Sequence, residues 1–223
     1  MADSTSPARV LVLISGSGSN LQALIDAANT DRLPNVQFVR LIADRKNAYG
    51  LERAKKANIP TTYHGFLPYK KDHQDTPDSP QTSPARHAYD ADLAHLVLAD
   101  KPDIVVCAGF MRIMTTSILD KLAEAKVPII NLHPAMPGDL VGAHCIERAW
   151  DEFQAGKRTS TGIMIHYVIA EVDKGAPIES EKVDITGCET LEQLQERIHQ
   201  AEHVLIVKGT KKAIETRRRK QGT

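Results

Sequence analysis

The stretch Arg9-Val-Leu-Val-Leu-Ile-Ser-Gly-Ser-Gly-Ser-Asn20 decides the fold of this chain. After Arg9, its first residues are apolar on both faces of an extended strand, which is typical of a central strand in a parallel sheet. A glycine-rich turn follows at 15–20, and a helix is predicted from about Leu21 to Ala28. A strand, a glycine turn and a helix in this order offer backbone N–H groups and the positive end of a helix dipole to an anion.

Two anions are candidates for this turn. A dinucleotide fingerprint requires a third glycine where Leu21 stands, and an acidic residue about 20 residues further on, where Asp44 is roughly in range. A single phosphate needs only the turn and Ser or Asn donors, and we favour this interpretation because the third glycine is missing.

The same alternation of strand and helix continues along the chain. Because crossovers between parallel strands are right-handed, the pattern predicts an α/β fold with a doubly wound, mostly parallel seven-stranded sheet, Rossmann-like and mixed at its C-terminal edge. The predicted strands are 9–14, 38–43, 61–64, 103–108, 127–130, 161–169 and 177–183, and the later predicted helices are 49–58, 85–99, 145–154 and 191–208.

The predicted organisation is one domain over residues 9–208. Residues 1–8 are small and polar and are expected to be disordered, and the Pro-rich, polar segment 66–84 is an insertion loop. The basic tail 209–223, which contains Arg217-Arg218-Arg219-Lys220, is expected to be solvated.

The composition excludes several classes of protein. Among 223 residues, 28 Lys and Arg balance 28 Asp and Glu, so no global field favours nucleic acid or an anionic membrane. The apolar run Val10–Ile14 is too short for a signal or membrane segment. Three widely spaced cysteines suit reduced thiols, so we expect a cytoplasmic protein. We also expect a monomer or homodimer whose partners are small molecules.

A second polar stretch, residues 131–144, follows the apolar run 127–130. Side chains two apart on a strand leave the same face, so Asn131 and His133 are predicted to point into one place. Pro134, Pro137 and the glycines after them stiffen the loop that follows. Because ligands of such sheets bind beyond the carboxyl ends of the strands, we expect this stretch, the glycine turn and Gly109–Arg112 to converge on one rim.

Zinc and a cysteine nucleophile are two alternatives for the chemistry. An inverted zinc motif is matched by His199-Gln200-Ala201-Glu202-His203, but only Glu215 remains further along the chain as a third ligand. The geometry of the helix predicts that His203 faces outward, while Glu202 borders the buried apolar face of the helix. We therefore expect no metal, and we expect Glu202 to bind an amine or hydroxyl. Cys145 beside His144 is a weaker candidate, because adjacent helical residues diverge by about 100°.

The remaining set is Asn131, His133 and Asp173. Asn131 and a protonated His133 can donate to an oxyanion, and Asp173 can keep the imidazole charged or move a proton through water. This set suits acyl transfer in which one substrate supplies its own nucleophile.

At these residues the chain resembles the folate-dependent formyltransferases, and among them the phosphoribosylglycinamide formyltransferases. The resemblance covers about residues 9–207 and has two departures, Ala135-Met136-Pro137-Gly138 after His-Pro, and His199 in place of a more usual Gln. The motifs that carry it are Ser15-Gly16-Ser17-Gly18-Ser19-Asn20-Leu21-Gln22, Gly109-Phe110-Met111-Arg112-Ile113, Asn131-Leu132-His133-Pro134, Gly142-Ala143-His144 and Asp173-Lys174-Gly175.

The resemblance implies transfer of a formyl group from 10-formyltetrahydrofolate, as a co-substrate, to the amine of 5'-phosphoribosylglycinamide in purine biosynthesis. Asn131, His133 and Asp173 would be catalytic, with His144 paired to Asp173 and His199 in support. The nucleotide would bind Gly18, Ser19, Asn20 and Glu202. The folate would bind Arg86, Met111, Arg112, Ile113, Met114, Asn131, Ile169, Ala170, Glu171 and Val172.

Two further activities remain as alternatives. A formyltetrahydrofolate hydrolase would use the same three residues with water as the acceptor, but its relatives carry an extra N-terminal domain, for which a first strand at Arg9 is expected to leave no room. A non-catalytic folate- or nucleotide-binding regulator is the other, and a turnover assay separates it from an enzyme.

Overall fold

A computed structural model describes residues 6–72 and 81–221, with side chains to Lys220. Its seven-stranded sheet has the order β3-β2-β1-β4-β5-β6-β7; β1 to β5 are parallel, and β6 and β7 are antiparallel to their neighbours. The predicted mostly parallel sheet with a mixed C-terminal edge is confirmed. The strands are β1 (Ala8–Ile14), β2 (Val36–Ala43), β3 (Thr61–Tyr63), β4 (Ile104–Cys107), β5 (Ile129–His133), β6 (Ser160–Tyr167) and β7 (Pro177–Asp184).

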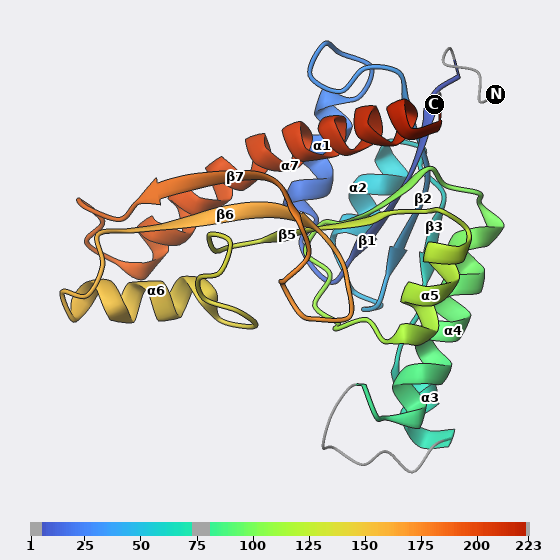
Figure 1. The fold of residues 1–223 in the computed structure, drawn as a ribbon, viewed down its shortest axis with the longest axis horizontal. Coiled ribbons are helices and arrows are strands. Elements are labelled where there is room, and N and C mark those ends of the chain that lie inside the picture. Colours follow the sequence, from blue (N-terminus) through green and yellow to red (C-terminus); the bar gives the residue numbers. More distant parts are fainter. Residues whose placement is uncertain (1–5, 73–80, 222–223) are drawn as a thin grey trace.

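Helices cover both faces of the sheet (Figure 1). Helices α1, α2 and α7 lie on one side, and α4 and α5 lie on the other, with the hairpin of β6 and β7 extending away beside α6. The helices are α1 (Ser19–Ala27), α2 (Gly50–Lys56), α3 (Leu67–Asp72), α4 (Pro84–Ala99), α5 (Thr116–Glu124), α6 (Cys145–Gln154) and α7 (Leu191–Gln221).

The central strand β1 shows why the sheet is buried on both faces. Val10, Val12 and Ile14 belong to the apolar cluster under α1 and α7. Leu11 and Leu13 belong to the cluster under α4 and α5. Successive side chains of a strand alternate between faces, so a continuous apolar run supplies both cores.

The register brings the strand ends to one level. Leu13 pairs with Cys107, and Cys107 pairs with Asn131, so the residues that follow in β1, β4 and β5 reach the same rim of the sheet. There the N–H of Ser15 donates to the carbonyl of Gly109 at 2.9 Å. The segments after β1 and β4 are therefore in direct contact, as predicted for a site at this rim.

The last helix is longer than predicted. It continues from Leu191 through the segment predicted to be a separate basic tail, to Gln221. Gly209 allows this, because a Cβ there would lie 2.6 Å from Ile165 Cγ1, and Ala213 and Ile214 are buried beyond it. Arg217 pairs with Asp103 at 2.5 Å. Apolar contacts thus extend the helix past the point where the basic run indicated an end.

The predicted insertion at 66–84 and the N-terminal segment also differ from expectation. The insertion contains α3, and α4 begins at Pro84 after Ser83, whose hydroxyl accepts the N–H of Arg86. The part at 73–80 lies outside the described residues, as do residues 1–5 of the predicted disordered N-terminus, and β1 already begins at Ala8. None of the helices within residues 6–72 and 81–221 combines the length and apolarity needed to cross a bilayer.

Candidate active site

The glycine turn between β1 and α1 is tightly enclosed by backbone. Gly18 has a φ of 70°, and a Cβ on it would lie 2.6 Å from the Cα of Gly50. Only glycine meets both conditions. The first backbone N–H groups of α1, from Ser19 onward, have no partner within the helix, so the turn presents the donors that an anion requires.

Helix α7 meets this turn through Glu202. Its buried carboxylate accepts a hydrogen bond from Asn20 Nδ2 at 3.2 Å. Burial raises the pKa of Glu202, while the Asn20 hydrogen bond and the nearby His199 oppose that shift. His199 itself is exposed. Contrary to the prediction, His203 does not face outward but is half-buried, with its Nε2 enclosed, and burial lowers its pKa.

Strand β5 presents Asn131 and His133 on one face, two residues apart, as predicted. His133 is buried, and its Nε2 lies 2.8 Å from the carbonyl oxygen of Leu140. A carbonyl only accepts, so Nε2 carries a hydrogen and donates it there. The other ring nitrogen, Nδ1, lies 3.4 Å from Asp173 Oδ2, which makes it the nitrogen that faces the centre of the site.

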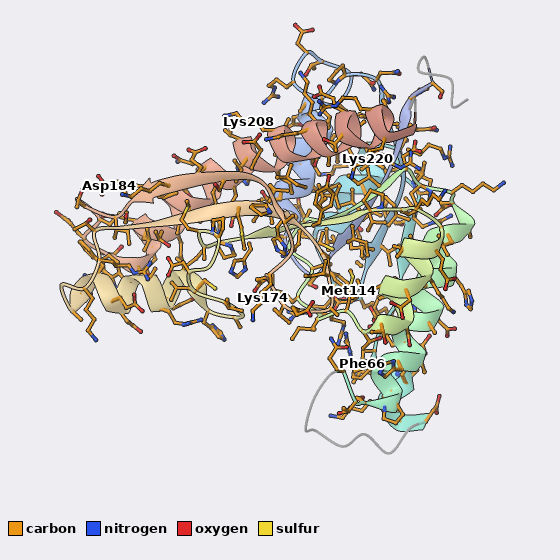
Figure 2. All side chains as sticks on the ribbon, viewed as in Figure 1. Phe66, Met114, Lys174, Asp184, Lys208 and Lys220 are labelled. Carbon is orange, nitrogen blue, oxygen red and sulfur yellow. The ribbon has the colours of Figure 1, made fainter. Side chains whose placement is uncertain are left out.

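Asp173 is placed by the loop between β6 and β7. Its φ is 57°, and its Oδ2 accepts the N–H of Gly142 at 2.9 Å. Two residues on, Gly175 packs against the chain so closely that a Cβ would lie 1.6 Å from the carbonyl oxygen of Tyr167. The loop therefore folds back over the sheet and holds the carboxylate beside His133. Figure 2 shows Lys174 of this loop and Met114 of the segment after β4 at a similar height in the view, with Phe66 below them.

The histidine predicted to pair with Asp173 is not the one that does. His144 begins α6 with a φ of 58°, is 80% exposed at its side chain, and lies 4.0 Å from Glu147. The left-handed turn at His144 directs its ring to solvent, so the predicted pair is wrong. Instead Asp173 Oδ1 lies 3.6 Å from Nε2 of His166. His166 was missed because only the pairing of β5 with β6 brings it opposite Asn131.

The segment after β4 carries four of the residues predicted to bind folate, Met111 to Met114. Met111 and Ile113 are exposed, Met114 is buried, and the N–H of Met111 donates to Ser15 Oγ at 2.8 Å. Arg86 is buried in α4, and its guanidinium donates to the carbonyl of Ile113. The glycine turn and this segment thus share one rim, and Arg86 holds the segment from behind.

The site thus consists of an amide, an imidazole and a carboxylate on the rim that also carries the glycine turn. A family model described as "Formyl transferase" matches residues 8–210. The chain belongs to the formyl transferase family. This confirms the family resemblance seen in the motifs.

Relatives of this formyl transferase carry a more specific description. Phosphoribosylglycinamide formyltransferase from Schizosaccharomyces pombe is 49% identical over 203 residues, which are 91% of this chain and 95% of that protein. The Saccharomyces cerevisiae protein of the same name is 47% identical over 212 residues, 93% of this chain and 98% of that protein. Glycinamide ribonucleotide transformylase 1 from Symbiobacterium toebii has a similar structure, with a TM-score of 0.80, 31% identity and coverage of 94% and 89% of the two chains.

Among the residues that the structure describes, no base faces the thiol of Cys145 in this formyl transferase. Its thiol lies 3.7 Å from His133 Nε2, but that nitrogen donates to Leu140 and has no lone pair to receive a proton. The thiol contacts the carbonyls of Leu140 at 3.1 Å and Gly142 at 3.0 Å, and burial raises its pKa. The arrangement therefore favours transfer without a cysteine nucleophile. Within residues 6–72 and 81–221, no three His, Cys, Asp or Glu side chains gather to hold a metal ion.

A cavity of about 610 Å³ lies beside Ile169 and Ala170 of the loop that carries Asp173. This volume is in the range of small-molecule sites. Of the residues predicted to bind folate, only these two line it, and its other walls come from α5, the start of β5 and the C-terminal part of α7. Leu119, Ile129 and Val168 give it an apolar interior, while Lys126 and Lys220 lie at its basic side.

Arg112 of the formyl transferase has a structural partner. Its Nε lies 2.6 Å from Oδ2 of the buried Asp44, and its guanidinium stacks on Phe66 at 4.9 Å and Tyr89 at 5.3 Å. The side chain thereby ties the segment after β4 to the end of β2 and to the start of the insertion. We infer that its main contribution is to hold this segment in place.

We predict that Arg112→Lys lowers the free energy of unfolding by about 1–2 kcal/mol, because lysine keeps the charge but loses the planar stack on two rings. Urea denaturation measures the change. Arg45→Lys is the matched control, since Arg45 is exposed one residue after Asp44 and should change stability by less than about 0.5 kcal/mol. Equal effects of the two substitutions would contradict the assigned role of Arg112.

Proposed function

We propose that this chain transfers a formyl group from 10-formyltetrahydrofolate to the amine of 5'-phosphoribosylglycinamide. The observation that carries the proposal is the position of Asp173, whose carboxylate lies 3.4 Å from His133 on the rim that also carries the glycine turn. The names of the fungal relatives, at 47% and 49% identity, support phosphoribosylglycinamide as the acceptor of a formyl group. Both substrates are small molecules, in keeping with the neutral overall charge.

The nucleotide is proposed to bind at the junction of α1 and α7. The N–H groups at Gly18, Ser19 and Asn20 would hold the phosphate, because a helix N-terminus favours negative charge. Glu202, fixed by Asn20, would accept hydrogen bonds from the ribose or the glycinamide end. The acceptor amine would then be held near Asn131 and His133.

The folate is proposed to lie between the segment after β4 and the loop after β6. Exposed side chains of Met111 and Ile113 on one side, and of Ile169 on the other, give apolar surface to a flat ring. Arg86, Arg112 and Met114 would support the first wall from below. Ala170, Glu171 and Val172 continue the second wall toward Asp173. The cavity beside Ile169 is a separate space, because its other walls come from α5, the start of β5 and α7.

The reaction proposed for this site is direct acyl transfer. The neutral amine attacks the formyl carbon, a C–N bond forms, and the carbonyl electrons move to an oxyanion that accepts hydrogen bonds from Asn131 Nδ2 and His133 Nδ1. Asp173 stabilises the charge on His133 and relays a proton from the attacking amine, through water, to the folate nitrogen. The bond from the formyl carbon to that nitrogen then breaks, giving formylglycinamide ribonucleotide and tetrahydrofolate.

The test is to mix the protein with 5'-phosphoribosylglycinamide and a 10-formylfolate, and to follow the absorbance change as the formyl group leaves. We expect the folate to lose its formyl group only when the nucleotide is present. The amount of deformylated folate should equal the amount of formylated nucleotide. Release without the nucleotide would identify a hydrolase that uses water as the acceptor. Binding of folate without any release would identify a non-catalytic protein.

Glu202→Gln provides a separate prediction for the nucleotide subsite. Glutamine keeps the shape and an acceptor for Asn20 but removes the charge, so KM for the nucleotide should rise by about 10-fold, the loss of one charge-assisted hydrogen bond. KM for the folate and kcat should change little. Glu196→Gln, on the exposed side of the same helix, is the control and should leave all three parameters unchanged. A rise in KM for the folate instead would place Glu202 in the other subsite.

A further inference from the structure

His166 lies at the centre of the catalytic set without having been assigned a part in it. It is on β6, directly opposite Asn131 in the antiparallel register, and is 2% exposed. Its Nε2 lies 3.3 Å from Asn131 Nδ2 and 3.6 Å from Asp173 Oδ1. One ring nitrogen therefore faces both the amide and the carboxylate proposed to act in the reaction.

The protonation of this ring follows from its partners. Nδ1 of His166 lies 2.9 Å from the carbonyl oxygen of Tyr167, which only accepts, so Nδ1 carries a hydrogen. Burial lowers the pKa of His166, and the neighbouring His133 lowers it further, while the Tyr167 bond and Asp173 oppose the shift. The ring is consequently neutral near pH 7, with a lone pair on Nε2.

A lone pair on Nε2 determines how the Asn131 amide is oriented. The amide atom that faces Nε2 must be the donor Nδ2, because its oxygen has no hydrogen to give. The amide oxygen of Asn131 then points away from His166. The second hydrogen on Nδ2 does not point to His166 and is left for another acceptor. With the opposite ring tautomer, the amide would rotate by 180° and present an oxygen where an oxyanion needs a donor.

We propose that His166 is a positioning residue that orients the Asn131 amide, through its neutral Nε2, for stabilisation of the oxyanion. This inference rests on the proposed function. Protonation of Nε2 would reverse the arrangement, because an Nε2–H would repel the amide N–H and would donate to Asp173 Oδ1 instead. The charged groups facing His166 are Asp173 from the loop after β6 and His133 from β5. The activity should therefore fall as pH is lowered through the depressed pKa of His166.

Two substitutions at position 166, to asparagine and to glutamine, distinguish the contribution of Nδ1 from that of Nε2. His166→Asn places a donor near the position of Nδ1 and nothing at Nε2, so it keeps the Tyr167 bond and loses the acceptor for Asn131. His166→Gln reaches the Nε2 position with an acceptor that does not titrate. We expect His166→Asn to lower kcat by about 10²-fold with both KM values little changed, as for a catalytic group misplaced by about 1 Å. His166→Gln should retain most of the kcat of the unsubstituted protein. The plot of its kcat against pH should lack the decrease at low pH that protonation of His166 causes.

A double-mutant cycle tests whether His166 acts through Asn131. In an Asn131→Ala background, His166→Asn should cause little further loss of kcat, whereas independent effects would add the same factor of about 10² again. Equal kcat for His166→Asn and His166→Gln, or additive losses in the cycle, would overturn the proposal.

A measurement on the unsubstituted protein does not depend on whether the variants fold. Nitrogen-15 NMR of labelled histidine should show His166 as the neutral form with hydrogen on Nδ1 at pH 7. The Nε2–H form, or a protonated ring at that pH, would overturn the proposal. Absence of formyl transfer in the unsubstituted protein would instead overturn the proposed function, and the NMR result would still be interpretable on its own.

Discussion

Asp173→Asn is expected to lower kcat by about 10²–10⁴-fold, the usual contribution of proton transfer by a positioned group. The substitution keeps the size of the side chain and leaves an oxygen able to accept the Gly142 N–H, so the loop should stay in place. It removes the negative charge 3.4 Å from His133 Nδ1, and with it the group that relays the proton of the attacking amine. KM for either substrate should change little, because the carboxylate acts mainly in the transition state.

Steady-state kinetics with the 10-formylfolate assay measures this effect, and circular dichroism verifies that the fold is retained. Asp151→Asn is the control, because Asp151 is an exposed aspartate on α6 that is remote from the proposed chemistry. Near-full turnover of Asp173→Asn would exclude the proposed role of the carboxylate, whatever the effect on binding.

Asn131→Ala is expected to lower kcat by about 10²–10³-fold, or about 3–4 kcal/mol in the barrier, which is typical for loss of one oxyanion donor. The alanine keeps the backbone pairing of β5 with β6, so the change should be confined to the side-chain donor. Asn131→Asp should be at least as severe, because a carboxylate has no hydrogen to donate and its charge opposes an oxyanion.

Single-turnover kinetics on both variants separates the chemical step from product release. A kcat for Asn131→Asp well above that of Asn131→Ala would show that position 131 does not face negative charge in the transition state.

The strands and the rim were predictable because they depend on local pattern. The apolar run of β1, the glycine turn and the i, i+2 spacing of Asn131 and His133 each act within a few residues, and the structure has all three. The partner of Asp173 was not predictable in the same way. Whether His144 or His166 meets that carboxylate depends on the left-handed turn before α6 and on the register between β5 and β6, which neighbouring residues do not encode.

The length of α7 shows a second limit of local pattern. Gly209 and the basic run at 217–220 both resemble signals for the end of a helix. In the structure Gly209 is the residue that lets the helix pass Ile165, and Arg217 pairs with Asp103, directly before β4. A glycine required for close packing and a glycine that ends a helix are identical in the sequence, and only the tertiary contact distinguishes them.

The close approach of Gly175 to the Tyr167 carbonyl has a consequence for folding. Asp173 reaches His133 only after the β6–β7 hairpin has closed in its final register, because the backbones of residues 167 and 175 must already be in contact. This hairpin joins the sheet through antiparallel pairing beside β5. Recovery of turnover during refolding should therefore report the docking of this edge of the sheet.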